Sequence, residues 1–394
     1  MSCWKQQTPD PPKPRRLRTH PMGKYFNLLA GDPAPWFRQR SFANPRYSIH
    51  AAAGRYIVLC FFGSAAHPLG QAVIAMALRR QDIFNDAHCS FFGVSLDPRD
   101  ESENRVADRY PGYRFLWDFD AQVSELYGVA PQDASMLEKR ARIRRLCFVL
   151  DPTLRILKVL PLADAGDMQA LLSYLAGLPP PSRFAGVELQ APILLLPNVF
   201  PPEFCRELIT LYETHGGRES GFMREENGKT VLAHDHGHKR REDYDITDPA
   251  IMQAAQAWIH RRVVPEIAKV HQFKATRMER YVIGCYRADQ QAHFSAHRDN
   301  TTRGTVHRRF AVSINLNDDF EGGEVSFPEY GPRSFKPPPG GAVVFSCSLL
   351  HAVSTVTRGR RYAFLPFLYD DEAAKVREAN NAFLDKGLLA TYKA

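Results

Sequence analysis

Short apolar runs alternate with a helical pattern in the first half of the chain. Runs of strand length lie at residues 56–62, 90–96 and 146–150. Between the first two runs, residues 70–85 have the pattern of a helix. Strands that alternate with helices are typical of an α/β layer fold, so we predict an α/β domain in this half.

A proline-rich segment separates this pattern from a second one. Residues 178–182 read Leu-Pro-Pro-Pro-Ser, and consecutive prolines cannot join a helix or a central strand. The apolar run at 193–196 predicts a buried strand, and the spacing of apolar residues after Pro202 predicts a helix. No internal repeat relates the two halves. We therefore divide the chain into a disordered basic arm (1–22), an α/β domain (23–178), a linker (179–190), a second domain (191–373) and a C-terminal helix and tail (374–394).

Composition places the chain among ordinary globular proteins. Its 394 residues are enough for two cores, and 44% are hydrophobic and 24% charged. No apolar run approaches the roughly 18 to 20 residues that a membrane span needs, and the N-terminus lacks the apolar core of a signal peptide. Seven scattered cysteines argue against a disulfide framework. We expect a cytoplasmic protein without a membrane partner.

The net charge of +8 and the pI of about 9.1 come largely from basic clusters. These clusters lie at residues 13–18, 139–145 and 239–241, and none belongs to a recognisable nucleic-acid module. We interpret them as solvated faces and a disordered arm, and we do not expect a nucleic-acid partner.

One short motif suggests a metal. In an extended strand, residues i and i+2 project from the same face, so His297 and Asp299 can reach one ion. His351, which lies 54 positions after His297, would arrive from another strand. Two imidazoles and one carboxylate on one side of a metal suit non-haem Fe(II). Alone, the motif is weak, because such tripeptides occur by chance and single histidines usually only pack.

A basic residue follows the second histidine. Arg361 lies ten positions after His351 and could hold the far carboxylate of a dicarboxylic ligand through two hydrogen bonds. The surrounding stretches 316–327, 339–345 and 356–362 add specificity. With them, the chain from about residue 192 to about 369 resembles the prolyl 4-hydroxylase-like branch of the Fe(II)/2-oxoglutarate-dependent dioxygenases.

This resemblance implies a double-stranded β-helix, or jelly roll, with flanking helices. It implies that His297, Asp299 and His351 bind Fe(II) and that Arg361 binds the 5-carboxylate of 2-oxoglutarate. Tyr286 would contact the same co-substrate. Tyr281 is the alternative, because the stretch after Tyr286 is about two residues longer than is usual in the family; strand packing remains open for both tyrosines.

The same resemblance implies a reaction. 2-Oxoglutarate is decarboxylated to succinate and CO₂ while the side chain of a peptide, protein or free amino acid is hydroxylated, with proline among the candidates. L-Ascorbate would serve as reductant. No catalytic side chain beyond the metal site is required.

The first domain resembles a peroxiredoxin of the thioredoxin-like fold. The resemblance rests on Gly-Asp-Pro-Ala-Pro-Trp-Phe at residues 31–37 and on the order of strands and helices. Peroxiredoxins carry their reactive cysteine at the start of the following helix, but residues 63–70 contain none. We predict that Cys60, Cys89 and Cys147 are core residues and that the domain is no peroxidase.

Two hypotheses follow. The favoured one is a 2-oxoglutarate-dependent dioxygenase whose first domain presents substrate or supports the fold; the alternative is a thioredoxin-like redox or scaffold protein whose oxygenase domain is secondary. The histidine-rich residues 234–238 and the basic residues 303–309 are expected to be solvent-exposed loops. Substrate contact is the other interpretation, and for the second segment the substrate would be acidic.

Overall fold

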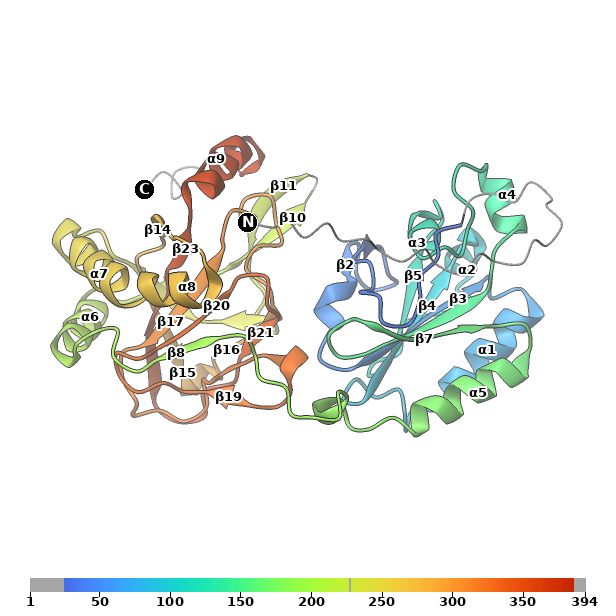
Figure 1. Ribbon diagram of the computed structural model, residues 1–394, viewed down its shortest axis with the longest axis horizontal. Helices are drawn as coiled ribbons and strands as arrows, with labels where there is room; N and C mark the ends of the chain where they lie inside the picture. Colours follow the sequence, from blue (N-terminus) through green and yellow to red (C-terminus); the bar gives the residue numbers. More distant parts are fainter. Residues whose placement is uncertain (1–24, 227, 386–394) are drawn as a thin grey trace, which may run out of the picture.

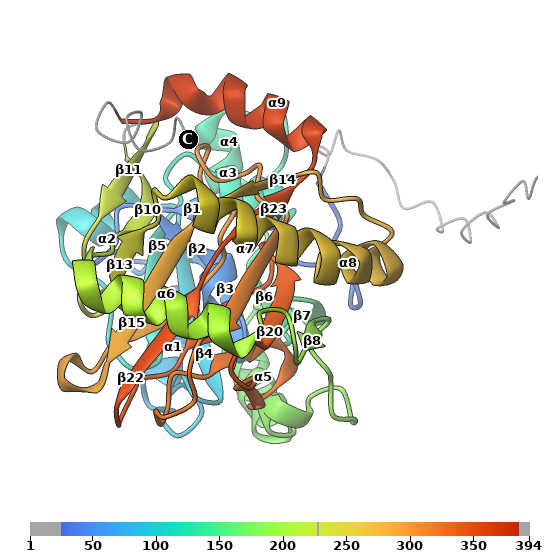
Figure 2. The same cartoon turned by 90° about the vertical axis from the view of Figure 1, so that its left-hand side faces the viewer.

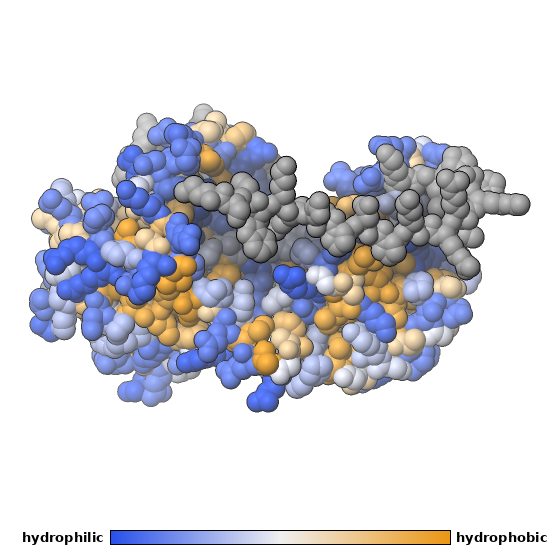
Figure 3. All heavy atoms as spheres, in the orientation of Figure 1, coloured by the Kyte–Doolittle hydropathy of each residue, from blue (hydrophilic) through white to orange (hydrophobic). Residues whose placement is uncertain are grey.

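The computed structural model describes residues 25–226 and 228–385, and these form two lobes that follow one another along the chain (Figure 1). The predicted basic arm lies outside the described residues. In the space-filling view, the surface is hollowed between the two lobes on their upper side (Figure 3). No helix of the described residues is long and apolar enough to cross a bilayer.

The first lobe is built on a five-stranded sheet in the order β5-β4-β3-β6-β7. The three strands β3, β4 and β5 are parallel, and β6 and β7 are antiparallel to their neighbours. Alternate residues of β3 pack on opposite faces: Val58 and Cys60 join one core cluster, and Leu59 and Phe61 the other. The strands are β3 (Tyr56–Gly63), β4 (Cys89–Ser95), β5 (Tyr113–Trp117), β6 (Leu146–Leu150) and β7 (Ile156–Pro161).

Helices and short segments cover both faces of this sheet. Two longer helices lie side by side on one face (Figure 1). The predicted helix at 70–85 ends earlier, because the chain turns after Leu78 and the side chain of Asn85 accepts hydrogen bonds from two following amides. The segments are β1 (Arg38–Gln39), β2 (Tyr47–Ser48), η1 (Ile49–Ala52), α1 (Pro68–Leu78), α2 (Pro98–Ser102), α3 (Gln122–Leu126), α4 (Met136–Ala141) and α5 (Ala165–Ala176).

The connection between the lobes is mostly irregular. Apart from the single turn η2 (Pro181–Arg183), residues 177–193 have no regular structure. Tyr56 of β3 donates its hydroxyl to the carbonyl of Pro179 at 2.9 Å, which fixes the start of this segment on the first lobe.

The second lobe consists of two mainly antiparallel sheets, as the predicted jelly roll requires. The larger sheet has the order β14-β23-β17-β22-β15-β13-β9, with β20 attached to β17 and β8 attached to β20; the smaller has the order β12-β16-β21-β18-β19. The larger sheet contains β8 (Leu194–Leu196), β9 (Arg218–Glu219), β13 (Glu242–Asp245), β14 (Arg277–Glu279), β15 (Val282–Arg287), β17 (Phe310–Asn315), β20 (Ala342–Ser346), β22 (Arg360–Phe364) and β23 (Phe367–Tyr369). The smaller contains β12 (Lys239–Arg240), β16 (His293–His297), β18 (Val325–Ser326), β19 (Ser334–Phe335) and β21 (His351–Val353).

Helices cover the outer face of the larger sheet (Figure 2). The predicted helix after Pro202 is α6 (Pro202–His215), which buries Phe204, Leu208 and Tyr212 against the sheet and ends where Gly216 adopts a positive φ of 71°. The remaining segments are the hairpin β10 (Phe222–Glu226) and β11 (Lys229–Ala233), the helices α7 (Pro249–Arg262), α8 (Val264–His271) and α9 (Asp371–Asn380), and the short turns η3 (Ala288–Gln290), η4 (Pro328–Tyr330) and η5 (Asn381–Phe383).

The prediction of a buried strand at 193–196 is wrong in one respect. The strand β8 exists, but it lies at the edge of its sheet and pairs only with β20. Leu195 is 49% exposed, because an edge strand on this surface has no element packed over its outward face.

The described cysteines are all buried and free of disulfides. Cys60, Cys89 and Cys147 lie in β3, β4 and β6, which confirms their prediction as core residues. Burial raises the pKa of the Cys89 and Cys147 thiols above their usual range, so neither supplies a reactive thiolate at neutral pH.

Candidate metal centre

The three predicted metal ligands converge on the smaller sheet. His297 is the last residue of β16 and lies opposite His351, the first residue of β21. Asp299 lies two residues after His297, just beyond the end of β16. The Nε2 atom of His297 lies 3.6 Å from one carboxylate oxygen of Asp299, and that of His351 lies 3.4 Å from the other. Ligand atoms about 2.1 Å from one ion and at right angles to each other lie roughly 3 Å apart. The observed spacing therefore fits one small cation.

Backbone carbonyls orient both imidazoles. The Nδ1 atom of His297 lies 2.8 Å from the carbonyl oxygen of Ser295, and that of His351 lies 3.0 Å from the carbonyl oxygen of Leu349. Because a carbonyl only accepts, each Nδ1 carries a proton, and each ring turns its Nε2 toward Asp299.

The charges of the three groups suit metal binding. Burial, together with the nearby His351, lowers the pKa of His297 to about 4, so this ring is neutral at physiological pH. Burial alone would raise the pKa of Asp299, but the two imidazoles and Arg308 hold it below its usual range. The site therefore presents two imidazole nitrogens and one carboxylate.

A single carboxylate ties both ligand strands together. Glu329 in η4 forms a two-pronged salt bridge with Arg298, the residue between His297 and Asp299, at 2.8 and 3.0 Å. The same side chain accepts a hydrogen bond from the backbone amide of Leu350, which precedes His351, at 3.0 Å. Glu329 thus holds the two ligand segments at a fixed separation, and nothing in the local sequence around it indicates this role.

Arg361 is a buried cation with neutral partners. Only 1% of the residue is exposed; its Nε donates to Asn315 at 2.9 Å and its Nη2 to Ser313 at 2.8 Å. Its Nη1 has no hydrogen-bond partner among the described residues, and no salt bridge joins it to a carboxylate there. Burial lowers the pKa of this guanidinium. A buried charge with an unused donor is stabilised by an anion, which is what the far carboxylate of a dicarboxylic ligand would provide.

Tyr286 lies beside this arginine. It pairs with Arg361 across β15 and β22, and the guanidinium carbon of Arg361 lies 5.2 Å from the centre of its ring. The hydroxyl of Tyr286 accepts a hydrogen bond from Arg241 at 3.2 Å. Tyr281, the alternative, instead packs half-buried in the core between the larger sheet and the helices. The additional residues after Tyr286 form the turn η3, so they do not displace this tyrosine.

A turn formed by two glycines makes room for Arg361. Gly322 and Gly323 have φ values of 73° and 65°, which L-residues with a side chain rarely adopt. A Cβ atom on Gly323 would lie 3.0 Å from the Cδ of Arg361 and 2.8 Å from a methyl of Val356. The second glycine therefore permits both the turn and the position of the guanidinium.

A cavity of about 590 Å³ opens next to the predicted ligands, and His297 and Asp299 form part of its wall. Lys239 also lines it and is only 4% exposed; its ammonium donates to the hydroxyl of Ser220 at 2.7 Å and to the carbonyl of Gly221 at 2.6 Å. Burial lowers the pKa of Lys239 well below its usual value.

The basic cluster at 239–241 is therefore not a solvated face, contrary to its interpretation from sequence. Lys239 and Arg241 point inward, and Arg241 forms a two-pronged salt bridge with Asp243, with both distances 2.6 Å. All five residues from 239 to 243 are charged, so the local sequence did not indicate which of these side chains point inward.

The segments 234–238 and 303–309, which we expected to be solvent-exposed loops, are each partly buried. His234, Asp235 and His236 are exposed, but His238 is partly buried, lines the cavity and has its ring 6.3 Å from that of His297. In the segment 303–309, His307 and Arg308 are buried, because both bind Glu279 of β14 at 2.9 and 2.7 Å.

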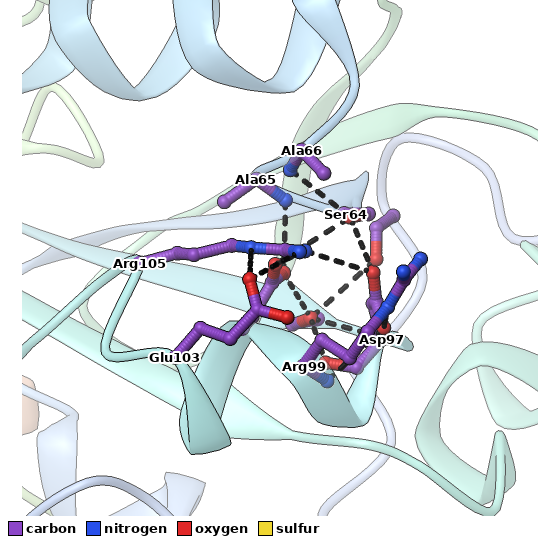
Figure 4. A network of polar contacts seen from close by, with 10 residues as sticks. Ser64, Ala65, Ala66, Asp97, Arg99, Glu103 and Arg105 are labelled. Atoms are coloured by element: carbon purple, nitrogen blue, oxygen red, sulfur yellow. Dashed lines mark hydrogen bonds and ion pairs between the residues drawn. The ribbon is translucent and has the colours of Figure 1, made fainter.

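The first lobe has a different polar network where a peroxiredoxin carries its thiol (Figure 4). The hydroxyl of Ser64 donates to Asp97 at 2.8 Å, and the backbone amide of Ala65 donates to the fully buried Asp100 at 2.8 Å. Arg105 bridges both carboxylates at 3.1 and 3.2 Å. Carboxylates bound to this loop would raise the pKa of a neighbouring thiol and disfavour its thiolate. The surrounding charges are therefore consistent with the absence of a cysteine from this loop.

Two family models match two separate stretches of the chain. Residues 277–369, which contain all five residues of the predicted iron and 2-oxoglutarate site, match the 2OG-Fe(II) oxygenase superfamily. The C-terminal domain is similar to these oxygenases. Residues 30–159 match the AhpC/TSA family, so the N-terminal domain is similar to the peroxiredoxins and has a thioredoxin-like fold. Both resemblances predicted from the sequence are confirmed.

Curated relatives match part of the chain. A PKHD-type hydroxylase of Paracoccus denitrificans (strain Pd 1222) is 42% identical over 86 residues, which are 20% of this chain and 38% of that protein. The PKHD-type hydroxylase GOX0559 of Gluconobacter oxydans (strain 621H) is 37% identical over 86 residues, with the same shares. The chain thus spans little more than a third of the length of these relatives.

Solved structures of both kinds align with the chain. A prolyl hydroxylase of Trichoplax adhaerens, in complex with a hypoxia inducible factor oxygen degradation domain peptide fragment, has a TM-score of 0.37 and 16% identity over 48% of this chain and 86% of that one. Peroxidoxin BcpB of Mycobacterium tuberculosis has a TM-score of 0.32 and 21% identity over 39% of this chain and 99% of that one.

Proposed function

We propose that the protein is an Fe(II)- and 2-oxoglutarate-dependent dioxygenase that hydroxylates an amino-acid or peptidyl side chain. One observation carries the proposal: two imidazole Nε2 atoms and a carboxylate converge in the same lobe as a buried guanidinium with an unused donor. The first set fits a cation and the second fits an anion. A metal and a dicarboxylate are the two components that this reaction needs.

In this proposal each residue has a defined task. His297, Asp299 and His351 would bind Fe(II) on one side, Arg361 would bind the 5-carboxylate of 2-oxoglutarate, and Tyr286 would flank that carboxylate. When bound, iron and 2-oxoglutarate supply the oxidising chemistry, in which the co-substrate becomes succinate and CO₂. The chain contributes ligand orientation through backbone carbonyls and Glu329, and it surrounds the co-substrate carboxylate with buried polar groups.

The substrate class follows from the relatives only as a proposal. The hydroxylases named above support a peptide or amino-acid substrate, and a prolyl side chain is the leading candidate. L-Ascorbate as reductant and a cytoplasmic location stay predictions. The alternative redox function is not favoured, since no cysteine of the described residues is exposed.

Succinate release tests the proposal. Purified full-length protein with Fe(II), 2-oxoglutarate and O₂ should form succinate slowly even without substrate, and His297→Ala should abolish it. His293→Ala is the matched control, because His293 lies on the same strand but outside the predicted ligand set. Succinate formation that survives His297→Ala would overturn the assignment of the metal site, and reduction of hydrogen peroxide by the protein would favour the redox alternative.

A further inference from the structure

The two lobes meet at the predicted metal site. Arg298, which separates two of the ligands, is 7% exposed and reaches across to the thioredoxin-like domain. Its guanidinium carbon lies 4.7 Å from the centre of the Trp36 ring, and its Nη2 donates to the carbonyl of His50 at 3.5 Å. The salt bridge to Glu329 completes its surroundings. The loop between the ligands is therefore packed against the other domain.

Apolar contacts close the same interface. Leu350, the residue before the predicted ligand His351, belongs to a core cluster of the thioredoxin-like domain that includes Ile49 and Ala52. Gly54 approaches Pro328 so closely that a Cβ atom on the glycine would lie 2.6 Å from the proline side chain. These contacts place residues 44–54 of the first domain next to both ligand strands.

This segment lines the cavity that contains His297 and Asp299. The cavity of about 590 Å³ falls in the range that encloses a drug-sized ligand, and it exceeds what one amino-acid side chain fills. An extended peptide of a few residues fits this size. The first domain contributes the following residues to the wall: Asn44, Arg46, Tyr47, Ser48, His50 and Ala51.

A cluster of positive charge lies beside Arg46, which lines the cavity. Glu225 on β10 is shared by three guanidinium groups, those of Arg38 at 3.0 Å, Arg303 at 3.4 Å and Arg46 at 3.7 Å. Arg46 has the longest of these contacts, and 46% of its side chain is exposed. One carboxylate cannot neutralise three cations, so Arg46 retains capacity for a further anion.

A second exposed cation lines the same cavity. Arg218 of β9 is exposed and forms no salt bridge with any described residue. Most acidic groups of the wall are engaged: Asp243 binds Arg241 and Arg280, Glu219 binds His236, and Asp299 belongs to the predicted metal site; Asp245 is the exception. The cavity therefore offers more cations than anions to a ligand.

We propose that residues 44–51 of the thioredoxin-like domain form the outer wall of the oxygenase's substrate site, and that Arg46 and Arg218 select a peptide carrying acidic side chains. The proposal that this peptide is hydroxylated rests on the function proposed above. Recognition of the peptide does not rest on that function, because binding is measurable without iron or turnover. The domain that lost its thiol would thus have become a specificity element.

A matched pair of peptides tests the inference on the metal-free full-length chain. The probes are acetyl-Gly-Glu-Pro-Glu-Gly-amide and the same peptide with glutamine in place of both glutamates, and calorimetry measures both dissociation constants. We expect the acidic peptide to bind about tenfold or more tightly, since charge-assisted hydrogen bonds are lost with the amide. Arg46→Ala and Arg218→Ala should each reduce this preference, and together they should remove it.

Two further variants separate recognition from folding. Arg46→Glu should shift the preference toward a third peptide that has lysine in place of both glutamates, a result that simple unfolding cannot produce. Arg99→Ala is the control, because Arg99 is an exposed arginine of the same domain whose side chain does not line the cavity.

Three results would overturn the inference: equal affinity for the acidic and amide peptides, no binding of the acidic peptide at millimolar concentration, or an unchanged preference in the double variant. Absence of succinate formation with an intact acidic preference would reject the proposed function and leave the peptide site standing. Succinate formation without the acidic preference would support the proposed function and reject the peptide site.

Discussion

At the scale of single residues, the guanidinium of Arg361 is buried, and one of its hydrogen-bond donors has no partner among the described residues. Burial of a guanidinium among neutral groups destabilises a fold until an anion binds. We predict that Arg361→Met leaves the unfolding temperature unchanged or raises it, because an unpaired buried charge disappears. The same change should raise the KM for 2-oxoglutarate by about 100-fold, which corresponds to roughly 3 kcal/mol for a buried charge pair. Differential scanning calorimetry and succinate assays check the two effects, and a large fall in the unfolding temperature would show that Arg361 is structurally required.

Gly323 is the second test at this scale. Gly323→Ala imposes a strained φ and crowds Arg361, so we expect a loss of about 1–3 kcal/mol in stability and a higher KM for 2-oxoglutarate. Gly186→Ala is the matched control: its φ is 76°, but nothing lies within 4 Å of a Cβ atom there. If both variants change the KM equally, the crowding of Arg361 has no functional effect.

At the scale of elements, the strand β14 is held to the segment 303–309 by charge. Burial would raise the pKa of Glu279, but Arg308 and His307 hold it at about 2, below the usual 4.5. A lowered carboxyl pKa stabilises the fold fully above pH 4.5, and the contribution disappears as the pH falls toward 2. We predict that Glu279→Gln costs about 3 kcal/mol near neutral pH and that the difference from the wild type shrinks below pH 4.5. Urea unfolding over this pH range measures it, and a difference that does not vary with pH would contradict the assignment.

Elements also show how far sequence reasoning reaches. The strand positions of His297 and His351 were predictable from the flanking motifs. Asp299 was expected on the same strand as His297, but β16 ends at His297 and Asp299 lies in the turn that follows. The inward side chains of Lys239 and Arg308 were not, since their partners Ser220 and Glu279 lie about 20 to 30 residues away in the chain. Burial of a charge depends on such distant partners, whereas local patterns indicate only whether a segment is polar.

At the scale of the whole molecule, the interface between the lobes depends on an aromatic residue whose side chain is about half exposed. Trp36 is 53% exposed, yet its ring lies against Arg298. We predict that Trp36→Ala weakens the docking of the domains by about 1 kcal/mol, a typical cation–π contribution. Faster proteolysis within residues 177–193 should report the looser interface, and iron-dependent succinate formation should fall.

Trp258→Ala provides the comparison for this variant. Trp258 contacts Arg262 within α7 at 4.2 Å, so its removal deletes a similar interaction away from the interface. Equal proteolysis of the connecting segment in both variants would mean that Trp36 does not hold the domains together.

The position of Arg298 has a consequence for the history of this gene. Arg298 lies between two predicted metal ligands and contacts Trp36 and His50, so a change in one half of the chain affects the other. A recombinant that joined the C-terminal half to a related but unmatched N-terminal half would leave a buried guanidinium without its aromatic neighbour beside the predicted metal site. Selection should therefore keep the two halves together as one unit, and chimeras are expected to work only when Trp36 and Arg298 are exchanged as a pair.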